Sequence, residues 1–498
     1  MRKFWIVLIA LGLIAAFSMP ASAADVKFSG SYYVQGWYSH NNSLLDQDDT
    51  STLSGRGAAS LFHQRLRVQT EFKVAEGLFL TTRFDALERN WGDRRERNNN
   101  NQYPYVTPST VGTVETASRR ADHTYTAVPA TATTPAVTGF YNTQEQANIE
   151  FERAYITANL PFGQLNVGYY QDIQWGTLWL DTITTRPAIG LAVPVGPWTF
   201  VAKWKKNLEG SMNGYNDIGY INDSDADIYD VAVRYGAKGW EAGVLFEYGD
   251  SRANKVSDAA AYPSFATSIY AALPYFKATF GPLYLEGEAA YYFGTQKEYD
   301  GSAGNKCAGG TRCEDVDWEG WSAYLHAKYD LKPMYFGAMI VYSTGDDPNT
   351  KDKVEGGINA ALVAGQAFTP ALILWNDPYY TVFGAPGART RTNLSDPSRL
   401  QFMDNCLFVQ GYVGVKPTPK WDIALKAAWA KADEKPAGYV DDVYGTEIDL
   451  VATYKIFDNL SYMVGAAYLF TGDYFKGAVD TTNLENQYML MHQLTLTF

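Results

Sequence analysis

Apolar and polar side chains alternate residue by residue in segment after segment of this chain. The clearest case is residues 63–74, where one face carries His63, Arg65, Arg67, Gln69, Glu71 and Lys73, and the other carries Leu66, Val68, Phe72 and Val74. Successive side chains of a strand point to opposite faces, whereas a helix needs apolar residues at i, i+3 and i+4, so this pattern predicts β-strands. Since the alternation recurs from residues 26–38 to residues 488–498, it predicts an all-β protein.

The connections between these segments alternate between short turns and longer polar loops. We predict strands at 26–38, 60–74, 78–90, 148–160, 164–172, 188–195, 198–206, 227–236, 239–249, 266–280, 283–294, 319–330, 334–344, 402–415, 421–431, 444–456, 459–470 and 488–498. An even number of strands with all short turns on one side is typical of a transmembrane antiparallel β-barrel with short periplasmic turns and long extracellular loops. We expect about 18 strands. The segments 188–195 and 334–344 alternate poorly, so 16 strands remain an alternative. The competing fold is a secreted β-sandwich array or a propeller.

The N-terminal residues have the features of an export signal. A positive Arg2-Lys3 pair precedes a short apolar stretch, and small residues end at Ala23. This pattern predicts a signal peptide over residues 1–23 that is cleaved near Ala23. The alternative is a retained anchor, but the apolar stretch is shorter than the roughly 20 residues that span a bilayer.

The rest of the chain, residues 24–498, is predicted to be one barrel with long extracellular loops near 91–147 and 345–400. Its last strand alternates up to Phe498, which resembles the terminal signal read by the barrel-assembly machinery. Together with the export signal, this ending predicts a barrel in the lipid of a Gram-negative outer membrane.

Composition argues against several other classes of protein. Without Arg2 and Lys3 the chain has 39 basic and 54 acidic residues, a net charge of −15 that does not suit nucleic-acid binding. The five His and the Ser, Asp and Glu residues show no spacing typical of a catalytic site, so we predict no enzyme, no metal site and no cofactor. Cys307 and Cys313 share one predicted extracellular loop and could form a disulfide, with metal binding as the weaker alternative. Cys406 then stays alone.

The charged faces of the strands are expected to line the pore. The basic candidates are Arg65, Arg67, Arg83, Arg153, Lys203 and Lys205, and the acidic candidates are Asp85, Glu241, Glu247, Glu286 and Glu288. Basic residues dominate the early strands and acidic residues the middle ones, so we expect opposed charged walls with a transverse field. The alternative is that every barrel lumen is polar and this asymmetry is chance.

Pairing across the first short turn refines this prediction. It places Arg67 opposite Asp85 and Arg83 opposite Gln69, so Arg67 is neutralised. Arg65, Arg83 and Arg153 are then expected to keep free guanidinium groups that favour anions.

One long loop is too apolar to extend into water. Residues 344–400 contain Ala360-Ala361-Leu362-Val363 and Leu372-Ile373-Leu374-Trp375, which need burial. We expect the loop to fold into the barrel and narrow the pore. The alternative is an interface with a second subunit or a partner protein.

Several runs resemble a known group of proteins. Arg65–Phe72, Thr81–Glu88, Phe151–Tyr155, Asn166–Tyr169 and Trp175–Thr177 resemble outer-membrane porins of delta-proteobacteria such as Geobacter, including the OmpJ type. The early strands also distantly resemble the alginate-export barrel family, whose members have 18 strands and a strongly basic lumen. The mixed charges of this chain depart from that lumen.

The expected function is a porin for passive diffusion of small hydrophilic, possibly anionic, solutes. The resemblance also implies an alternative, a structural barrel that supports extracellular electron-transfer proteins, and a polysaccharide exporter is a third possibility. Homo-oligomers are a further expectation.

Overall fold

The structure is a computed structural model that describes residues 25–42, 44, 58–91, 124–127, 138–141, 149–172, 174–182, 184–210, 224–255, 264–299, 313–358, 368–376 and 402–498. The expected signal peptide, residues 1–23, lies outside the described residues.

The described chain is built almost entirely of long strands. They are β1 (Asp25–His40), β2 (Ala58–Ala75), β3 (Leu78–Asn90), β6 (Ile149–Leu160), β7 (Gly163–Gln171), β8 (Thr185–Val195), β9 (Trp198–Leu208), β10 (Ala226–Ala237), β11 (Trp240–Ser251), β12 (Phe265–Phe280), β13 (Leu283–Tyr299), β14 (Val316–Leu331), β15 (Met334–Ser343), β17 (Cys406–Val415), β18 (Trp421–Lys431), β19 (Val443–Phe457), β20 (Leu460–Thr471) and β21 (Gln487–Thr497). Each strand pairs antiparallel with the next one in this series.

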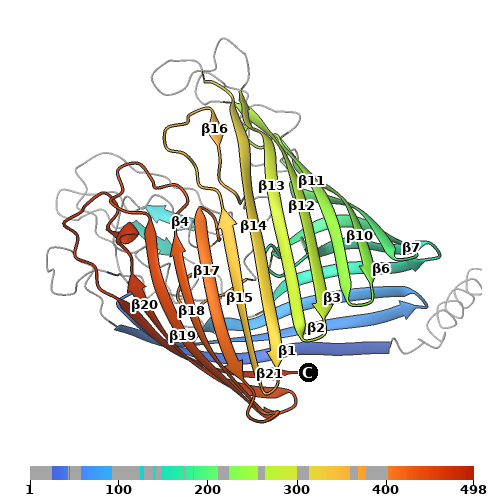
Figure 1. The fold of residues 1–498 in the computed structure, drawn as a ribbon. Helices are drawn as coiled ribbons and strands as arrows, with labels where there is room; N and C mark the ends of the chain where they lie inside the picture. The colour runs from blue at the N-terminus through green and yellow to red at the C-terminus, as the bar shows by residue number, and fades with distance from the viewer. Residues whose placement is uncertain are drawn as a thin grey trace, which may run out of the picture.

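The sheet closes on itself through its first and last strands. β1 pairs with β2 on one side and with β21 on the other, so that Gly36 lies opposite both Phe62 and His492. Gly30 and Phe498 exchange two backbone hydrogen bonds of 2.8 and 3.1 Å. The described strands therefore form a closed antiparallel barrel of 18 strands (Figure 1), as predicted, and the 16-strand, sandwich and propeller alternatives are wrong.

Short turns and longer connections alternate along the chain. Because neighbouring strands run in opposite directions, the short turns lie at one end of the barrel and the longer connections at the other. We call these ends the turn end and the loop end (Figure 1). Most of the short turns, such as those between β2 and β3 and between β10 and β11, span only two residues. Gly77 and Gly239 occupy these two turns with φ of +73° and +85°, in the left-handed region that favours glycine.

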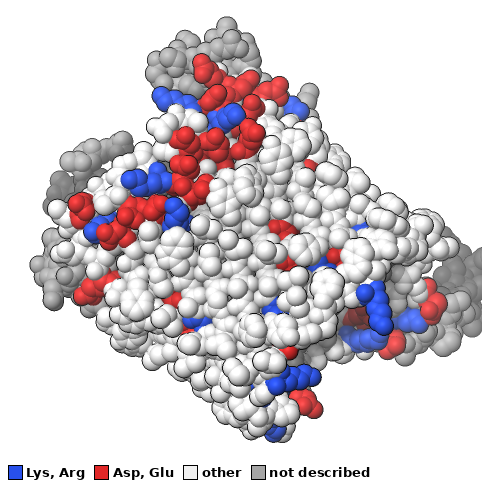
Figure 2. Space-filling model, viewed as in Figure 1, with Lys and Arg blue, Asp and Glu red and all other residues white. Residues whose placement is uncertain are grey.

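The two faces of the barrel wall differ in chemistry. Along β20, Val464, Tyr468 and Phe470 are 39–47% exposed, whereas the alternating residues Ala467 and Leu469 are buried. Figure 2 shows that the visible outer surface is largely uncharged between a charged loop end and scattered charges at the turn end. An apolar outer belt with polar ends is what a bilayer requires of a β-barrel that spans it.

Smaller elements lie in the connections and were not predicted. β4 (Thr124–Ala127) and β5 (Thr138–Tyr141) form a two-stranded sheet within the connection expected to be a simple loop, and β16 (Lys353–Val354) pairs parallel with β14. The 3-10 helix η3 (Asp473–Lys476) lies between β20 and β21. No helix among the described residues is long and apolar enough to cross a membrane.

Candidate functional site

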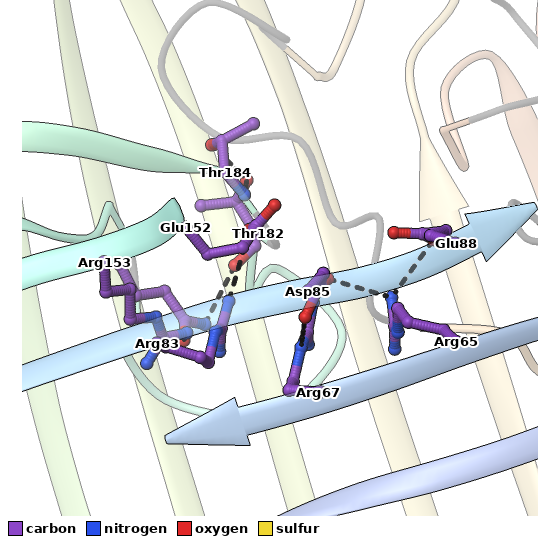
Figure 3. Close-up of polar contacts among 10 residues, drawn as sticks. Arg65, Arg67, Arg83, Asp85, Glu88, Glu152, Arg153, Thr182 and Thr184 are labelled. Carbon is purple, nitrogen blue, oxygen red and sulfur yellow. Dashed lines mark hydrogen bonds and ion pairs between the residues drawn. The ribbon is translucent and has the colours of Figure 1, made fainter. Parts of the chain in front are cut away.

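Four arginines from neighbouring strands lie together on the inner face of the barrel. Arg65 and Arg67 come from β2, Arg83 from β3 and Arg153 from β6, and Figure 3 shows them on one side of these strands. The pairing of β2 with β3 places Arg67 opposite Asp85 and Arg83 opposite Gln69, as predicted. Arg67 binds Asp85 through two hydrogen bonds, Nε to Oδ1 at 2.6 Å and Nη2 to Oδ2 at 2.5 Å, so its charge is neutralised.

The expectation that Arg65 and Arg83 keep free guanidinium groups is wrong. Nη1 of Arg65 lies 3.4 Å from Glu88 and 3.8 Å from Asp85, and Nη2 of Arg83 lies 3.5 Å from Glu152. The register of β3 and β6 shifts between Arg83 and Phe84, where a bulge leaves Glu152 outside the ladder. A bulge re-aims a side chain, and here Glu152 points inward beside Arg83, although strict alternation would send it outward.

The arginine cluster keeps a small positive excess. Its four guanidinium groups face three carboxylates, those of Asp85, Glu88 and Glu152. Arg153 donates a hydrogen bond to the side-chain oxygen of Gln171, a neutral partner. The side chains of Arg65 and Arg67 are 25% and 26% exposed, so this wall retains contact with water.

The described residues of the connection between β7 and β8, which are 172, 174–182 and 184, fold into the barrel instead of outward. Trp175 donates its indole N–H to the backbone oxygen of Leu273 on β12 at 3.0 Å. Thr177 donates its backbone N–H and its hydroxyl to Glu288 on β13, at 2.9 and 2.6 Å, and the ring of Trp179 stacks on Tyr324 of β14. This β7–β8 loop therefore reaches from one wall of the barrel to another wall several strands away.

A buried ion-pair network lies at the start of the same loop. Nζ of Lys205 lies 3.0 Å from Asp172 and 3.1 Å from Asp230, and it also contacts Glu247. Arg186 makes a second contact with Asp172. The side chains of Lys205 and Glu247 are fully buried. Buried charges of this kind need each other, because water no longer solvates them.

Five predicted pore-lining residues are buried and have little contact with open water. Lys205, Glu247 and Glu288 are 0%, 2% and 4% exposed, and Asp85 and Arg83 of the arginine cluster are 4% and 8% exposed. For Lys205, Glu247 and Glu288 the reason is the inward β7–β8 loop, which the alternation of the strands does not reveal. Lys203 also has protein partners, since it donates to the backbone oxygens of Gln171 and Asp172.

The remaining predicted acidic residues, Glu241 and Glu286, lie on β11 and β13. Glu241 is 3.7 Å from Nζ of Lys277. Glu286 accepts hydrogen bonds of 2.8 Å from the hydroxyls of Tyr284 and Tyr324, and it lies 3.3 Å from His326. Both acids thus have partners within the wall.

A second inward segment, residues 368–376, belongs to the connection between β15 and β17. Its residues Ile373, Leu374 and Trp375 are at most 1% exposed, as expected for the apolar part of this loop. The ring of Trp375 packs edge-on against Phe408 and Tyr444. Trp375 has a φ of +53°, a strained value for a bulky residue that persists only where the surroundings hold it. The run Ala360–Val363 of the same loop lies outside the described residues.

An inner cavity of about 530 Å³ extends along the strands from β1 to β9, and Arg153 is one of the residues that line it. Its lining contains three basic residues, Lys27, Arg153 and Lys203, and one acidic residue, Glu71. The other lining side chains are mainly amides, hydroxyls and aromatic rings. Lys27 and Glu71 lie 3.7 Å apart and compensate each other, so a positive excess remains.

The predicted disulfide involves one cysteine that the structure describes and one that it does not. Cys313 is disulfide-bonded, whereas its predicted partner Cys307 lies outside the described residues. Cys406 is buried and free. The described residues contain no group of three or more His, Cys, Asp or Glu side chains that could hold a metal ion.

Comparisons with known proteins concern the fold. No protein-family model and no curated protein matches the chain. Solved structures that are similar include three from Pseudomonas aeruginosa: OccK8 (OprE), with 11% identity over 95% of this chain and 98% of that one and a TM-score of 0.47; OpdQ, with 10% identity, 95% and 98% coverage and a TM-score of 0.48; and OpdK with vanillate, with 9% identity, 95% and 99% coverage and a TM-score of 0.45.

Proposed function

We propose that the chain forms a water-filled outer-membrane channel for small hydrophilic solutes, with a preference for anions. The closed barrel with its apolar belt supports a membrane-spanning position, and the inward segments between β7 and β8 and between β15 and β17 support a narrowed lumen. The charge of the surfaces that keep contact with water then decides which solutes pass.

The burial of acidic groups is the observation that carries the anion preference. Asp172, Asp230 and Glu247 surround Lys205, and Glu288 accepts its hydrogen bonds from the β7–β8 loop. Lys205 and Arg186 compensate two of the three charges of the network, and all four carboxylates are buried, so a solute in the lumen does not contact them directly. The arginine wall and the cavity beside Arg153 each keep a positive excess.

The local field outweighs the net charge of the whole chain. Charges separated by more than about 8–10 Å of salt solution are largely screened at moderate ionic strength. The acidic residues at the loop end (Figure 2) therefore affect a solute at the arginine wall less than the arginines themselves do.

The test is reconstitution of the purified protein in planar lipid bilayers. We expect stable open conductance without any added partner and a reversal potential in a KCl gradient on the anion-selective side. Replacing Arg65, Arg83 and Arg153 with Gln should shift that potential toward cations, and the shift should shrink in molar salt, where screening extends only to about 3 Å.

A control variant replaces a single ionisable side chain that is already buried. The control variant Glu288→Gln should leave the selectivity of the channel near that of the wild type, since Glu288 has little contact with water. A wild-type channel that prefers cations, with no change in the triple variant, would contradict the anion preference. Absence of any conductance would contradict the channel itself and favour a structural barrel.

A further inference from the structure

One carboxyl group of the barrel wall, that of Glu447, makes three hydrogen bonds to the inward segment 368–376, and Asp449 of the same strand lies beside it and also interacts with the backbone of Leu372. Glu447 on β19 accepts hydrogen bonds from three consecutive backbone N–H groups, those of Leu372 at 3.0 Å, Ile373 at 2.7 Å and Leu374 at 2.8 Å. Oε1 accepts the first two and Oε2 accepts the third. Consecutive N–H groups that converge in this way form a concavity that binds anions.

The same segment also contacts the neighbouring strands. The backbone oxygen of Pro370 accepts hydrogen bonds from Gln410 of β17 at 2.9 Å and from Lys426 of β18 at 3.1 Å. A Cβ added at Gly465 of β20 would lie 3.0 Å from the side chain of Leu372. The segment thus covers the inner face of four adjacent strands, and the bonds to Glu447 lie in the middle of this contact.

Glu447 lies where its carboxyl group binds the inward segment, and its hydrogen bonds go to that segment. Its side chain is 1% exposed and points inward, so it cannot be solvated by the lumen. A buried carboxylate is costly without hydrogen bonds, and three donors from one loop supply them. The wall and the loop therefore depend on each other at this point.

We propose that Glu447 is the positioning residue that fixes segment 368–376 in the lumen and thereby sets the width of the channel. Its carboxylate fills an anion-binding concavity that belongs to the loop. The inference rests on the proposed channel function. If Glu447 is removed, the loop keeps its three N–H groups but loses the two carboxyl oxygens that bind them to the wall.

The test uses the full-length protein in planar bilayers and the variant Glu447→Ala. In chloride salts we expect a larger and more fluctuating single-channel conductance than in the wild type, because the released segment moves away from β19. Sodium formate, a carboxylate small enough for the vacated space, should restore the steady wild-type value measured in the same salt. Neutral formamide should not restore it.

The control variant Gln410→Ala removes a contact to the same segment and leaves the carboxylate in place. The conductance of Gln410→Ala should respond to formate as the wild type does. If the substitutions only loosened the barrel in general, Gln410→Ala and Glu447→Ala would respond to formate in the same way. If Glu447→Ala does not fold, Glu447→Gln is used instead. Its single amide oxygen keeps part of the contact with the loop, and its side chain still fills the space that formate would need. We therefore expect Glu447→Gln to show a fluctuating conductance that formate does not change.

Three results would overturn the inference. The first is a wild-type conductance in Glu447→Ala, or in Glu447→Gln if that variant is used instead. The second is a Glu447→Ala conductance that is altered in chloride and equally altered in formate. The third is a Glu447→Ala conductance that formamide restores as well as formate does. A wild-type protein that conducts no ions at all would instead refute the proposed channel, so the two failures can be distinguished.

Discussion

Removal of the buried ammonium group of Lys205 should strongly destabilise the barrel. The variant Lys205→Met keeps most of the side-chain volume but leaves Asp230 and Glu247 without the cation that both contact. Asp172 keeps its contact with Arg186, so two of the three carboxylates lose their ionic partner. Breaking a buried ion pair by removing one partner costs about 3–5 kcal/mol, because the other charge stays buried.

The expected loss can be measured as a shift in an unfolding equilibrium. A loss of about 3 kcal/mol changes the ratio of unfolded to folded protein roughly a hundredfold, since each 1.4 kcal/mol is a factor of ten. The assay is urea unfolding of the barrel in phospholipid vesicles, followed by tryptophan fluorescence. Combining Lys205→Met with Asp230→Asn and Glu247→Gln should recover much of the loss, because the uncompensated charges are then gone.

A surface pair provides the matched control for this prediction. Lys353 lies 2.9 Å from Glu319, and the two side chains are 42% and 55% exposed. Water and salt screen such a pair, so Lys353→Met should leave the unfolding midpoint unchanged. If Lys205→Met also unfolds at the wild-type urea concentration, the buried network does not stabilise the barrel and our reasoning about it is wrong.

Three further predictions concern the loops and the orientation of the barrel. Burial raises the pKa of Asp181, in the β7–β8 loop, to about 6 from its ordinary value of 3.8, so the wild type should lose stability as the pH rises through this range. In urea unfolding at each pH, Asp181→Asn should be more stable than the wild type above pH 6 and as stable as the wild type below about pH 4. Gly176→Ala should weaken the contact of the same loop with β13, since Gly176 has a φ of +68° and the added Cβ would collide with the carboxyl group of Glu288. Single-channel recordings of this variant should show larger current fluctuations than the wild type. A steady wild-type conductance would contradict the inward position of the loop. A Cys at Lys351, in the β15–β17 connection, should react with an impermeant thiol reagent on whole cells, whereas a Cys at Glu76, in a short turn, should react only after the outer membrane is opened; the opposite labelling would reverse the barrel.

The alternation of side chains was sufficient to predict the barrel wall. Each of the 18 expected segments overlaps an observed strand, and the pairing of Arg67 with Asp85 follows from the position of one short turn. This succeeds because a strand that separates lipid from a polar lumen must alternate, and because a two-residue turn determines which residues lie opposite each other.

The composition of the lumen was determined by tertiary structure. Alternation assigns each side chain to a face but does not show a bulge, so the inward position of Glu152 could not be predicted. It also does not show which connections enter the barrel. The contact of Thr177 with Glu288 joins residues 111 positions apart, and it forms only because the closed barrel brings a loop from β7 to the inner face of β13. The sequence by itself determined which residues form the wall and, away from the bulge at Glu152, which of them face inward, whereas only the closed structure decided which inward charges meet water.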